Sequence, residues 1–154
     1  MSSGKITLEQ RKASLHYHVQ EYRKRRVIID TDAACEADDP FAIAQALMSK
    51  MLEVKGICAE HFVAEGSMEQ SYEMICRVTE AMGADVPALR GQTGKMSEHQ
   101  GEPMTEAAQF IIEETMKEDD KPLFVLCIGA VTNVAEAIRA TVSYTHLTLP
   151  TIRL

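Results

Sequence analysis

Residues 27–47 read VIIDTDAACEADDPFAIAQAL. The stretch joins an apolar run of β-branched residues, 27–29, to a helix-like segment, 40–47, through a turn that carries four aspartates. β-Branched residues favour a buried strand, and proline is well placed in the first turn of a helix. The pattern therefore predicts a strand, an acidic turn and a helix, with Asp30, Asp32, Asp38 and Asp39 between the strand end and the helix start.

The crowding of these acids is an electrostatic problem. Two ionised carboxylates about 4 Å apart repel each other by roughly 1–4 kcal/mol, depending on the effective dielectric. Such a group normally holds a cation, or keeps some of its members protonated. The turn therefore predicts a bound divalent metal. A simpler interpretation remains open for Asp39, which precedes Pro40 and could be a helix N-cap that needs no metal.

Length and charge limit the class of protein. A chain of 154 residues with 45% hydrophobic and 25% charged residues suits one globular domain. Of the net charge of −7, residues 1–26 contribute seven Lys or Arg against two acids, so residues 27–154 carry −12. An acidic body argues against nucleic acid as a partner, because nucleic acid requires a positive field. It suits a metal, or a neutral substrate held by hydrogen bonds.

The basic segment at residues 1–25 is predicted to be an N-terminal amphipathic helix or extension. Thr7 and Gln10 have capping-box spacing, and Leu15, Val19 and Tyr22 recur at helical intervals. A nucleic-acid-binding arm is the alternative that this charge leaves open.

Other sequence features bear on location. No apolar run reaches membrane-spanning length, and no apolar region of a signal peptide follows the early positive charges. The four cysteines are widely scattered, without the close pairs of a zinc site or a redox motif. We therefore expect reduced thiols, a cytoplasmic location and no association with a membrane.

The rest of the chain alternates strand and helix signals. It predicts an α/β fold with an open, mainly parallel sheet and helices on both faces, because repeated strand–helix units require right-handed crossovers. Ligands bind beyond the carboxyl ends of the strands in such sheets. The long polar loop at residues 91–103 is a candidate lid. Strands are predicted at 27–29, 52–58, 86–89 and 123–128, the last as a continuous apolar run of the buried parallel kind. Helices are predicted at 40–50, from a Ser67–Gln70 capping box to about 83, from Thr105, and at 134–140.

The last residues, 142–154, read VSYTHLTLPTIRL and do not continue the helical pattern before them. Their first six residues resemble an in-frame translation of a transposon end used in sequencing libraries. We therefore expect a non-native tail, a native chain that continued past residue 141, and a domain that here comprises residues 26–141. The alternative is a genuine terminal strand, since Tyr, Thr and Leu are common in strands.

Three motifs in order resemble the inosine–uridine-preferring nucleoside hydrolase family. The first is IIDTD at residues 28–32 with DDPFAIA at residues 38–44, similar to the family's Asp-x-Asp strand end and Asp-Asp helix start. The second, LEVKGI at residues 52–57, resembles the family's second strand. The third, GAVTNVA at residues 129–135, resembles its Gly-x-Leu-Thr-Asn-x-Ala turn. The resemblance covers residues 26–140 and implies a truncated form of the family's Rossmann-like core.

That resemblance implies a calcium-dependent hydrolase that splits a ribonucleoside into base and ribose. It assigns Asp30 as general base and metal ligand, and Asp39 and the backbone carbonyl of Ile128 as further ligands to Ca²⁺. Asp38 would accept hydrogen bonds from the ribose hydroxyls. Asp32 is expected to brace the loop. The parent of this chain would be a homo-oligomer, with the remaining site residues in its second half and little activity in this fragment.

Two departures from the family pattern matter. Five residues instead of three separate Asp-x-Asp from Asp-Asp, as in a longer branch of the family. The second strand is followed by EHFV at residues 60–63, where the family usually has Gly-Asn with the Asn on ribose. His61 is a candidate replacement, or a packed residue at a strand end. Asn133 or Thr132 is expected to cap the last helix, a structural role.

Two other functions remain open at this stage. A haloacid-dehalogenase-like phosphohydrolase also has Asp-x-Asp after its first strand, but it does not account for Asp38 and Asp39. A non-catalytic α/β domain that binds a cation or a ribosyl ligand is the second alternative.

Overall fold

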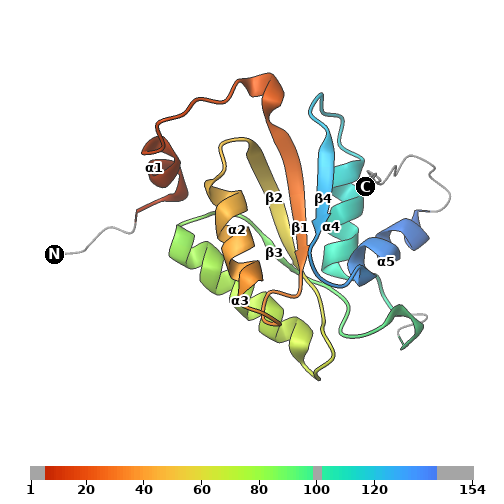
Figure 1. Cartoon of the computed structure of the whole chain (residues 1–154). Coiled ribbons are helices and arrows are strands. Elements are labelled where there is room, and N and C mark those ends of the chain that lie inside the picture. The colour runs from red at the N-terminus through yellow and green to blue at the C-terminus, as the bar shows by residue number, and fades with distance from the viewer. Residues whose placement is uncertain (1–5, 99–101, 142–154) are drawn as a thin grey trace, which may run out of the picture.

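A four-stranded parallel sheet forms the centre of the molecule, in a computed structural model that describes residues 6–98 and 102–141. The strands are β1 (Arg25–Thr31), β2 (Leu52–Ala59), β3 (Ala88–Arg90) and β4 (Leu123–Cys127), in the spatial order β3-β2-β1-β4. The helices are α1 (Leu8–Ala13), α2 (Asp38–Met48), α3 (Ser67–Met82), α4 (Glu106–Thr115) and α5 (Thr132–Ala140). The α/β fold with an open parallel sheet is confirmed (Figure 1).

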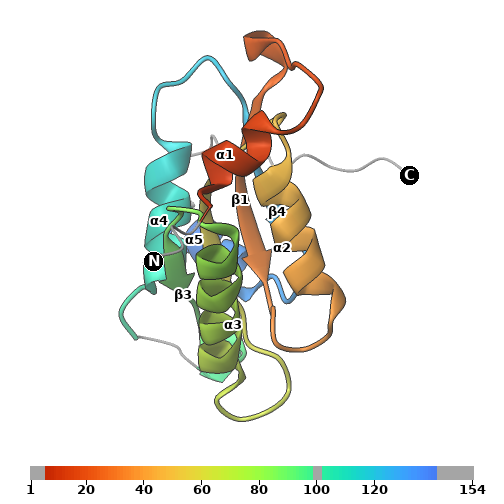
Figure 2. The same ribbon diagram turned by 90° about the vertical axis from the view of Figure 1, so that its left-hand side faces the viewer.

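Helices cover both faces of this sheet, as predicted. Ile29 and Ile57 pack on one side with the apolar faces of α2 and α3. Their neighbours Ile28 and Cys58 point to the other side, against α4 and α5. The central strand β1 is buried on both faces, which is why residues 27–29 are a continuous apolar run and not an alternating one. Figures 1 and 2 show the two helical layers on opposite sides of the strands.

Most predicted elements lie within a few residues of the observed ones. β3 begins after Pro87, whose carbonyl accepts a hydrogen bond from the Ile57 N–H while its own nitrogen needs no partner. Thr105 caps α4 as expected, accepting from the Ala108 N–H at 3.2 Å. The Thr7–Gln10 capping box is present at the start of α1.

The N-terminal helix was predicted too long. It ends at Ala13, and after residue 14 the chain continues without a helix to a short 3₁₀ turn at Glu21–Arg23. None of its residues is buried. Helical spacing of apolar residues is therefore insufficient here, because a short segment without a buried face gains little from continuing.

Two further predictions about local structure were wrong. Ser67 does not form a capping box with Gln70. Its hydroxyl bonds the N–H and carbonyl of Phe62, and Gly66, at φ 72°, precedes the helix. The apolar run of β4 is also not fully buried, since β4 is an edge strand and Leu126 is 36% exposed.

The amino ends of the strands carry a network of paired charges. Arg26 is buried and donates to both the carboxylate and the carbonyl of Glu114, at 3.0 and 2.8 Å. Lys121, just before β4, lies between the carboxylates of Glu21 and Glu53 at 2.6 and 2.5 Å. Arg26 and Lys121, at the amino ends of the strands, therefore each have a carboxylate beside them.

Candidate functional site

The carboxyl ends of all four strands meet at the other end of the sheet. Asp30, one residue before the end of β1, lies opposite Cys58 of β2 and Cys127 of β4. Glu60 follows β2, and its N–H donates to the Thr31 carbonyl at 2.7 Å. The Ile128 N–H, after β4, donates to the backbone carbonyl of Asp30 at 2.9 Å. Parallel pairing thus brings residues distant in sequence to one place, the usual position of a ligand site in this class of fold.

Asn133, in the first turn of α5, connects these strand ends. Its side-chain Nδ2 donates to Asp30 Oδ1 at 2.9 Å and to the Ala59 carbonyl at 3.0 Å. Its Oδ1 accepts from the Gln92 N–H, and its own backbone N–H donates to Glu60 Oε1, both at 3.0 Å. The side chain is fully buried and makes no cap for α5, so the predicted capping role is wrong.

Two carboxyl groups and a hydroxyl are buried here with unused hydrogen-bonding atoms. Asp30, Thr31 and Glu60 are all 0% exposed. Asp30 Oδ2, Thr31 Oγ1 and Glu60 Oε2 have no hydrogen-bond partner among the described residues while both acids are ionised, and a proton on Glu60 lets the two carboxyl groups bond each other. Buried polar atoms are nearly always bonded, so these oxygens require a shared proton, an ion, a solvent molecule or a ligand.

The pKa values of these carboxyl groups are raised. Burial is the main cause for both Asp30 and Glu60, and for Glu60 the neighbouring charge of Asp30 adds to it. The pKa of Glu60 is raised further than that of Asp30, because the protonated Glu60 also donates a hydrogen bond to Asp30. At neutral pH Glu60 therefore holds a proton and Asp30 carries the negative charge. One acid and one base beside each other are typical of a catalytic or ion-binding site.

The four aspartates of the acidic turn have different environments. Asp30 and Asp39 are buried, Asp32 is half-buried and Asp38 is exposed in the first turn of α2. Burial, and then the charges of Asp32 and Asp38, raise the pKa of Asp39 to about 6. Asp39 is not an N-cap, because α2 begins one residue earlier. The Asp32 carbonyl accepts from the Cys35 N–H at 2.7 Å and so closes the turn.

The other predicted residues lie around the same strand ends. Ile128 places its backbone beside Asp30, while its side chain is 42% exposed. His61 is half-buried, with Nε2 at 3.1 Å from Thr132 Oγ1. Thr132 therefore contacts His61 and, like Asn133, does not cap α5. Cys35 is no candidate nucleophile, since loss of hydration and the charges of Asp32 and Glu36 raise the pKa of its thiol.

Sequence reasoning missed Glu60, Gly91 and Gln92. Glu60 had one usable signal, a carboxylate directly after an apolar strand that ends beside the strand of Asp30. Gly91 follows β3, and a Cβ there would lie 2.1 Å from Asn133 Oδ1 and 2.4 Å from the Ala59 carbonyl oxygen. This glycine is needed for the close approach of Asn133, which no local pattern reveals.

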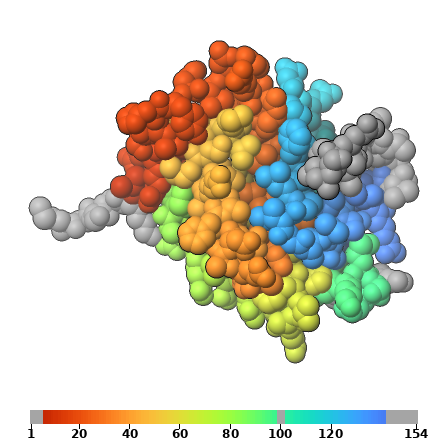
Figure 3. All heavy atoms as spheres, in the orientation of Figure 1, coloured from red at the N-terminus to blue at the C-terminus, as the bar shows by residue number. Residues whose placement is uncertain are grey.

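A cavity of about 670 Å³ opens next to these strand ends. Its walls come from the acidic turn (Asp32), the segment after β2 (His61) and the segment after β3 (Lys95), together with Ala130 after β4. In Figure 3, α2 in orange, the segment after β2 in yellow and the segment after β4 in blue meet on one face of the molecule. The cavity has the size expected for a small-molecule ligand.

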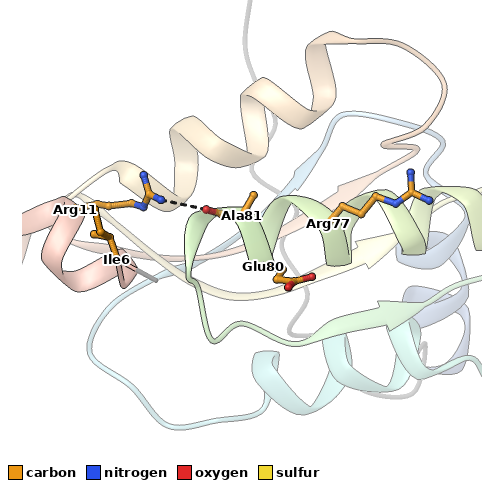
Figure 4. A pocket seen from close by; sticks show the side chains of 5 residues that line it. All are labelled: Ile6, Arg11, Arg77, Glu80 and Ala81. Atoms are coloured by element: carbon orange, nitrogen blue, oxygen red, sulfur yellow. Dashed lines mark hydrogen bonds between the residues drawn. The ribbon is translucent and has the colours of Figure 1, made fainter. Parts of the chain in front are cut away.

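A second hollow, of about 370 Å³, lies away from this site. It is lined by Arg11 of α1 and by Arg77 and Glu80 of α3, and Arg11 donates to the Ala81 carbonyl at 3.2 Å (Figure 4). The carboxyl end of α3 is beside the amino ends of the strands, because the helix runs back along the parallel sheet. This hollow therefore has no connection with the acidic cluster.

The donor atoms at these strand ends determine which metal ion the site could hold. The unbonded atoms are carboxylate and hydroxyl oxygens, which hard cations such as Ca²⁺ prefer. Within residues 6–98 and 102–141, however, no three His, Cys, Asp or Glu side chains are grouped so that they could hold a metal ion. The chemistry of the donors fits calcium, while the described part of the chain supplies only some of the six to eight ligands that calcium takes.

The family model of the inosine-uridine preferring nucleoside hydrolases matches residues 27–147. The last six of these belong to the tail predicted to be non-native, which lies outside the described residues. Among solved structures, the fold is similar to that of a nucleoside hydrolase-related hypothetical protein from Saccharophagus degradans that is associated with carbohydrate metabolism. The TM-score is 0.56 at 18% identity, over 79% of this chain and 34% of that one. No protein with a curated description matches significantly.

Proposed function

Because this chain belongs to the inosine-uridine preferring nucleoside hydrolase family, we propose that it carries part of the active site of a calcium-dependent N-ribohydrolase. The substrate would be a ribonucleoside, and the products a free base and ribose. The observation that carries this proposal is the buried carboxylate of Asp30, which has one oxygen held by Asn133 while no N–H group among the described residues holds the other. The chain spans about a third of the length of the structure that it resembles.

The residues of this chain would have separate roles in that reaction. As the bond from C1′ to the base breaks, the base leaves with the electron pair and takes up a proton. The water oxygen forms the new bond to C1′, and Asp30 Oδ2 would accept the proton that this water gives up. Asp38 is exposed at the start of α2, where it could accept hydrogen bonds from ribose hydroxyls, and His61 lines the adjoining cavity.

Asp30, Asp39 and the Ile128 carbonyl are the atoms of this chain that would hold calcium. When bound, calcium would lower the pKa of a water molecule and orient it with the ribose diol. The raised pKa of Asp39 supports this role, since a buried acid beside two others lacks a neutralising charge. An oxocarbenium-like transition state would also be stabilised by the surrounding negative charge.

A second function has its own support. The described residues contain no complete group of metal ligands, so this chain alone could bind a cation or a ribosyl ligand without catalysing hydrolysis. We propose that the 154-residue chain binds calcium weakly and hydrolyses nucleosides poorly. Other chemistry of the Asp-x-Asp class, such as phosphoryl transfer, has no support from the family match. For the described residues, no helix is long and apolar enough to cross a membrane.

Calcium titration calorimetry on the purified chain tests the proposal. We expect heat of binding for the wild type, a clear loss for Asp39→Ala, and wild-type behaviour for Asp85→Ala, an exposed acid between α3 and β3. Equal heats in Asp39→Ala and Asp85→Ala would refute the metal site. Ribose release from inosine and uridine, measured with the same samples, separates the two functions, because robust release would exclude the non-catalytic one.

A further inference from the structure

Asn133 connects three strand ends through one side chain, and its surroundings give it a more specific role than packing. We propose that Asn133 is a positioning residue that orients the Asp30 carboxylate, and that Gly91 provides the space that this orientation requires. The orientation is a property of the chain itself. Only its consequence for hydrolysis rests on the function proposed above.

The hydrogen bonds of Asn133 select one oxygen of each buried acid. The side chain holds Asp30 Oδ1 at 2.9 Å, and the backbone N–H holds Glu60 Oε1 at 3.0 Å. No N–H group among the described residues holds the second oxygen of either acid, and a proton on Glu60 lets the two acids bond each other. Asn133 thus determines which oxygen of Asp30 stays available. It also determines which oxygen of Glu60 does, through its backbone N–H.

The side-chain amide can take only one orientation here. Its two N–H groups meet two acceptors, Asp30 Oδ1 and the Ala59 carbonyl, while its oxygen meets a donor, the Gln92 N–H. Rotating the amide by 180° would bring its oxygen against acceptors and its NH₂ group against a donor. An aspartate in this position would lack the two donors, so no other residue of this shape makes the same set of bonds.

Gly91 is required by the same geometry. An added Cβ would lie 2.1 Å from Asn133 Oδ1, 2.3 Å from Nδ2 and 2.4 Å from the Ala59 carbonyl oxygen. The carbonyl belongs to the backbone of β2 and cannot move without disturbing the sheet. The amide would therefore have to turn or withdraw, and its bond to Asp30 would lengthen.

The chain offers a direct measurement of this orientation, because Asn133 is its only asparagine. Labelling with ¹⁵N-asparagine gives one pair of side-chain NH₂ signals in an NMR spectrum. We expect both protons to exchange with solvent much more slowly than those of a free asparagine. In Asp30→Ser, the exchange should become roughly tenfold faster or more, as expected for loss of a hydrogen bond to a charged group. Asp85→Ser, the matched control, should leave the signals unchanged.

Gly91→Ala provides a second variant that leaves Asp30 in place. It should shift the NH₂ signals and increase their exchange. If the wild-type protons exchange as in free asparagine, or if Asp30→Ser and Asp85→Ser have the same effect, the positioning role is refuted. The wild-type measurement remains decisive even if Asp30→Ser does not fold.

Calcium calorimetry on these samples distinguishes the two proposals. A protected amide that responds to Asp30→Ser, in a chain that binds no calcium, would support the positioning role and refute the proposed metal site. Calcium binding by a chain whose Asn133 amide exchanges freely would support the proposed metal site and refute the positioning role.

Discussion

The charged groups at the two ends of the sheet differ in whether they have partners of opposite charge. At the amino ends, Arg26 and Glu114 are both buried and bonded to each other, and Lys121 lies between two carboxylates. At the carboxyl ends, Asp30 and Glu60 are equally buried, but neither forms a salt bridge with a cation among the described residues, and their nearest charged neighbours are each other. Paired charges stabilise a fold, whereas unpaired acids kept in one place indicate a site for a cation or a ligand.

The largest effect is expected from removing the carboxylate partner of Arg26 at the amino ends of the strands. Glu114→Ala removes the carboxylate at 3.0 Å from buried Arg26 and should lower the free energy of unfolding by about 3 kcal/mol, because only the half-exposed Asp119, at 3.6 Å, then remains beside the guanidinium. Urea denaturation measures this loss. The exposed pair Arg77–Glu73 provides the control, and Glu73→Ala should change stability by no more than about 0.5 kcal/mol. Similar losses in both variants would contradict the assignment of a structural role to the amino end.

The contribution of Asp39, near the carboxyl ends of the strands, to the free energy of unfolding should depend on pH in the opposite sense to that of a salt-bridged acid. Folding raises the pKa of Asp39 from 3.8 to about 6, so the native state binds this proton more tightly than the unfolded state. The wild type therefore loses stability between about pH 4 and pH 6, and the loss is complete above that range. Asp39→Asn lacks this loss and should be more stable at pH 7, by up to roughly 3 kcal/mol, with no advantage near pH 4.

Thermal unfolding of wild type and Asp39→Asn at the two pH values measures this difference. Asp85→Asn is the control for removal of an exposed acid. Added calcium should narrow the gap at pH 7, since it would neutralise Asp39 in the wild type. An advantage of the same size at both pH values would show that the charge of Asp39 is not the cause.

A smaller effect is expected from the packing that holds the unpaired end together. Gly91→Ala should cost about 1–3 kcal/mol, because the new methyl group meets Asn133 and a backbone carbonyl. Gly56→Ala is the matched control. Its methyl group would meet the outer edge of the Phe110 ring, which can move, so the loss measured by urea denaturation should be smaller. The reverse order would contradict the tight packing at the carboxyl end.

The smallest effect concerns α1, near the amino ends. Thr7→Ala removes a hydroxyl that accepts from the Gln10 N–H at 3.2 Å and should destabilise this helix by about 1 kcal/mol. Hydrogen exchange of the Gln10 N–H should accelerate while the global unfolding free energy stays nearly constant. Ser14→Ala, at the other end of the helix, is the control. A large global loss would mean that α1 is an integral part of the fold.

Elements with a strong local signal could be predicted from sequence. The strand at residues 27–29 and the helix that follows the acidic turn were found because continuous apolar runs and a proline in the first turn are local properties. The predicted length of the N-terminal helix was wrong because a helix there would have no buried face. The predicted Ser67 capping box was wrong because the Ser67 hydroxyl bonds Phe62, a residue outside the pattern. The lid predicted at residues 91–103 and the tail at 142–154 remain predictions, since residues 99–101 and the whole tail lie outside the described chain.

The candidate site was predicted in part for the same reason. Asp30 and Asp39 were recognised because aspartates crowded in a short turn are visible in the sequence. Glu60, Gly91 and the true contacts of Asn133 were not recognised, because each acts on residues 30 to 103 positions away.

The sequence by itself determined the class of fold, the strand that carries the acids and the family to which they belong. These follow from apolar runs, turn residues and ordered motifs, all of which are short-range features. Only the tertiary structure decided that one asparagine joins three strand ends, that Glu60 and Asp30 share a buried site, and that Arg26 and Lys121 at the other end of the sheet lie beside carboxylates. Parallel pairing brings the carboxyl ends of distant strands together, and burial there converts ordinary acids into groups that require a partner.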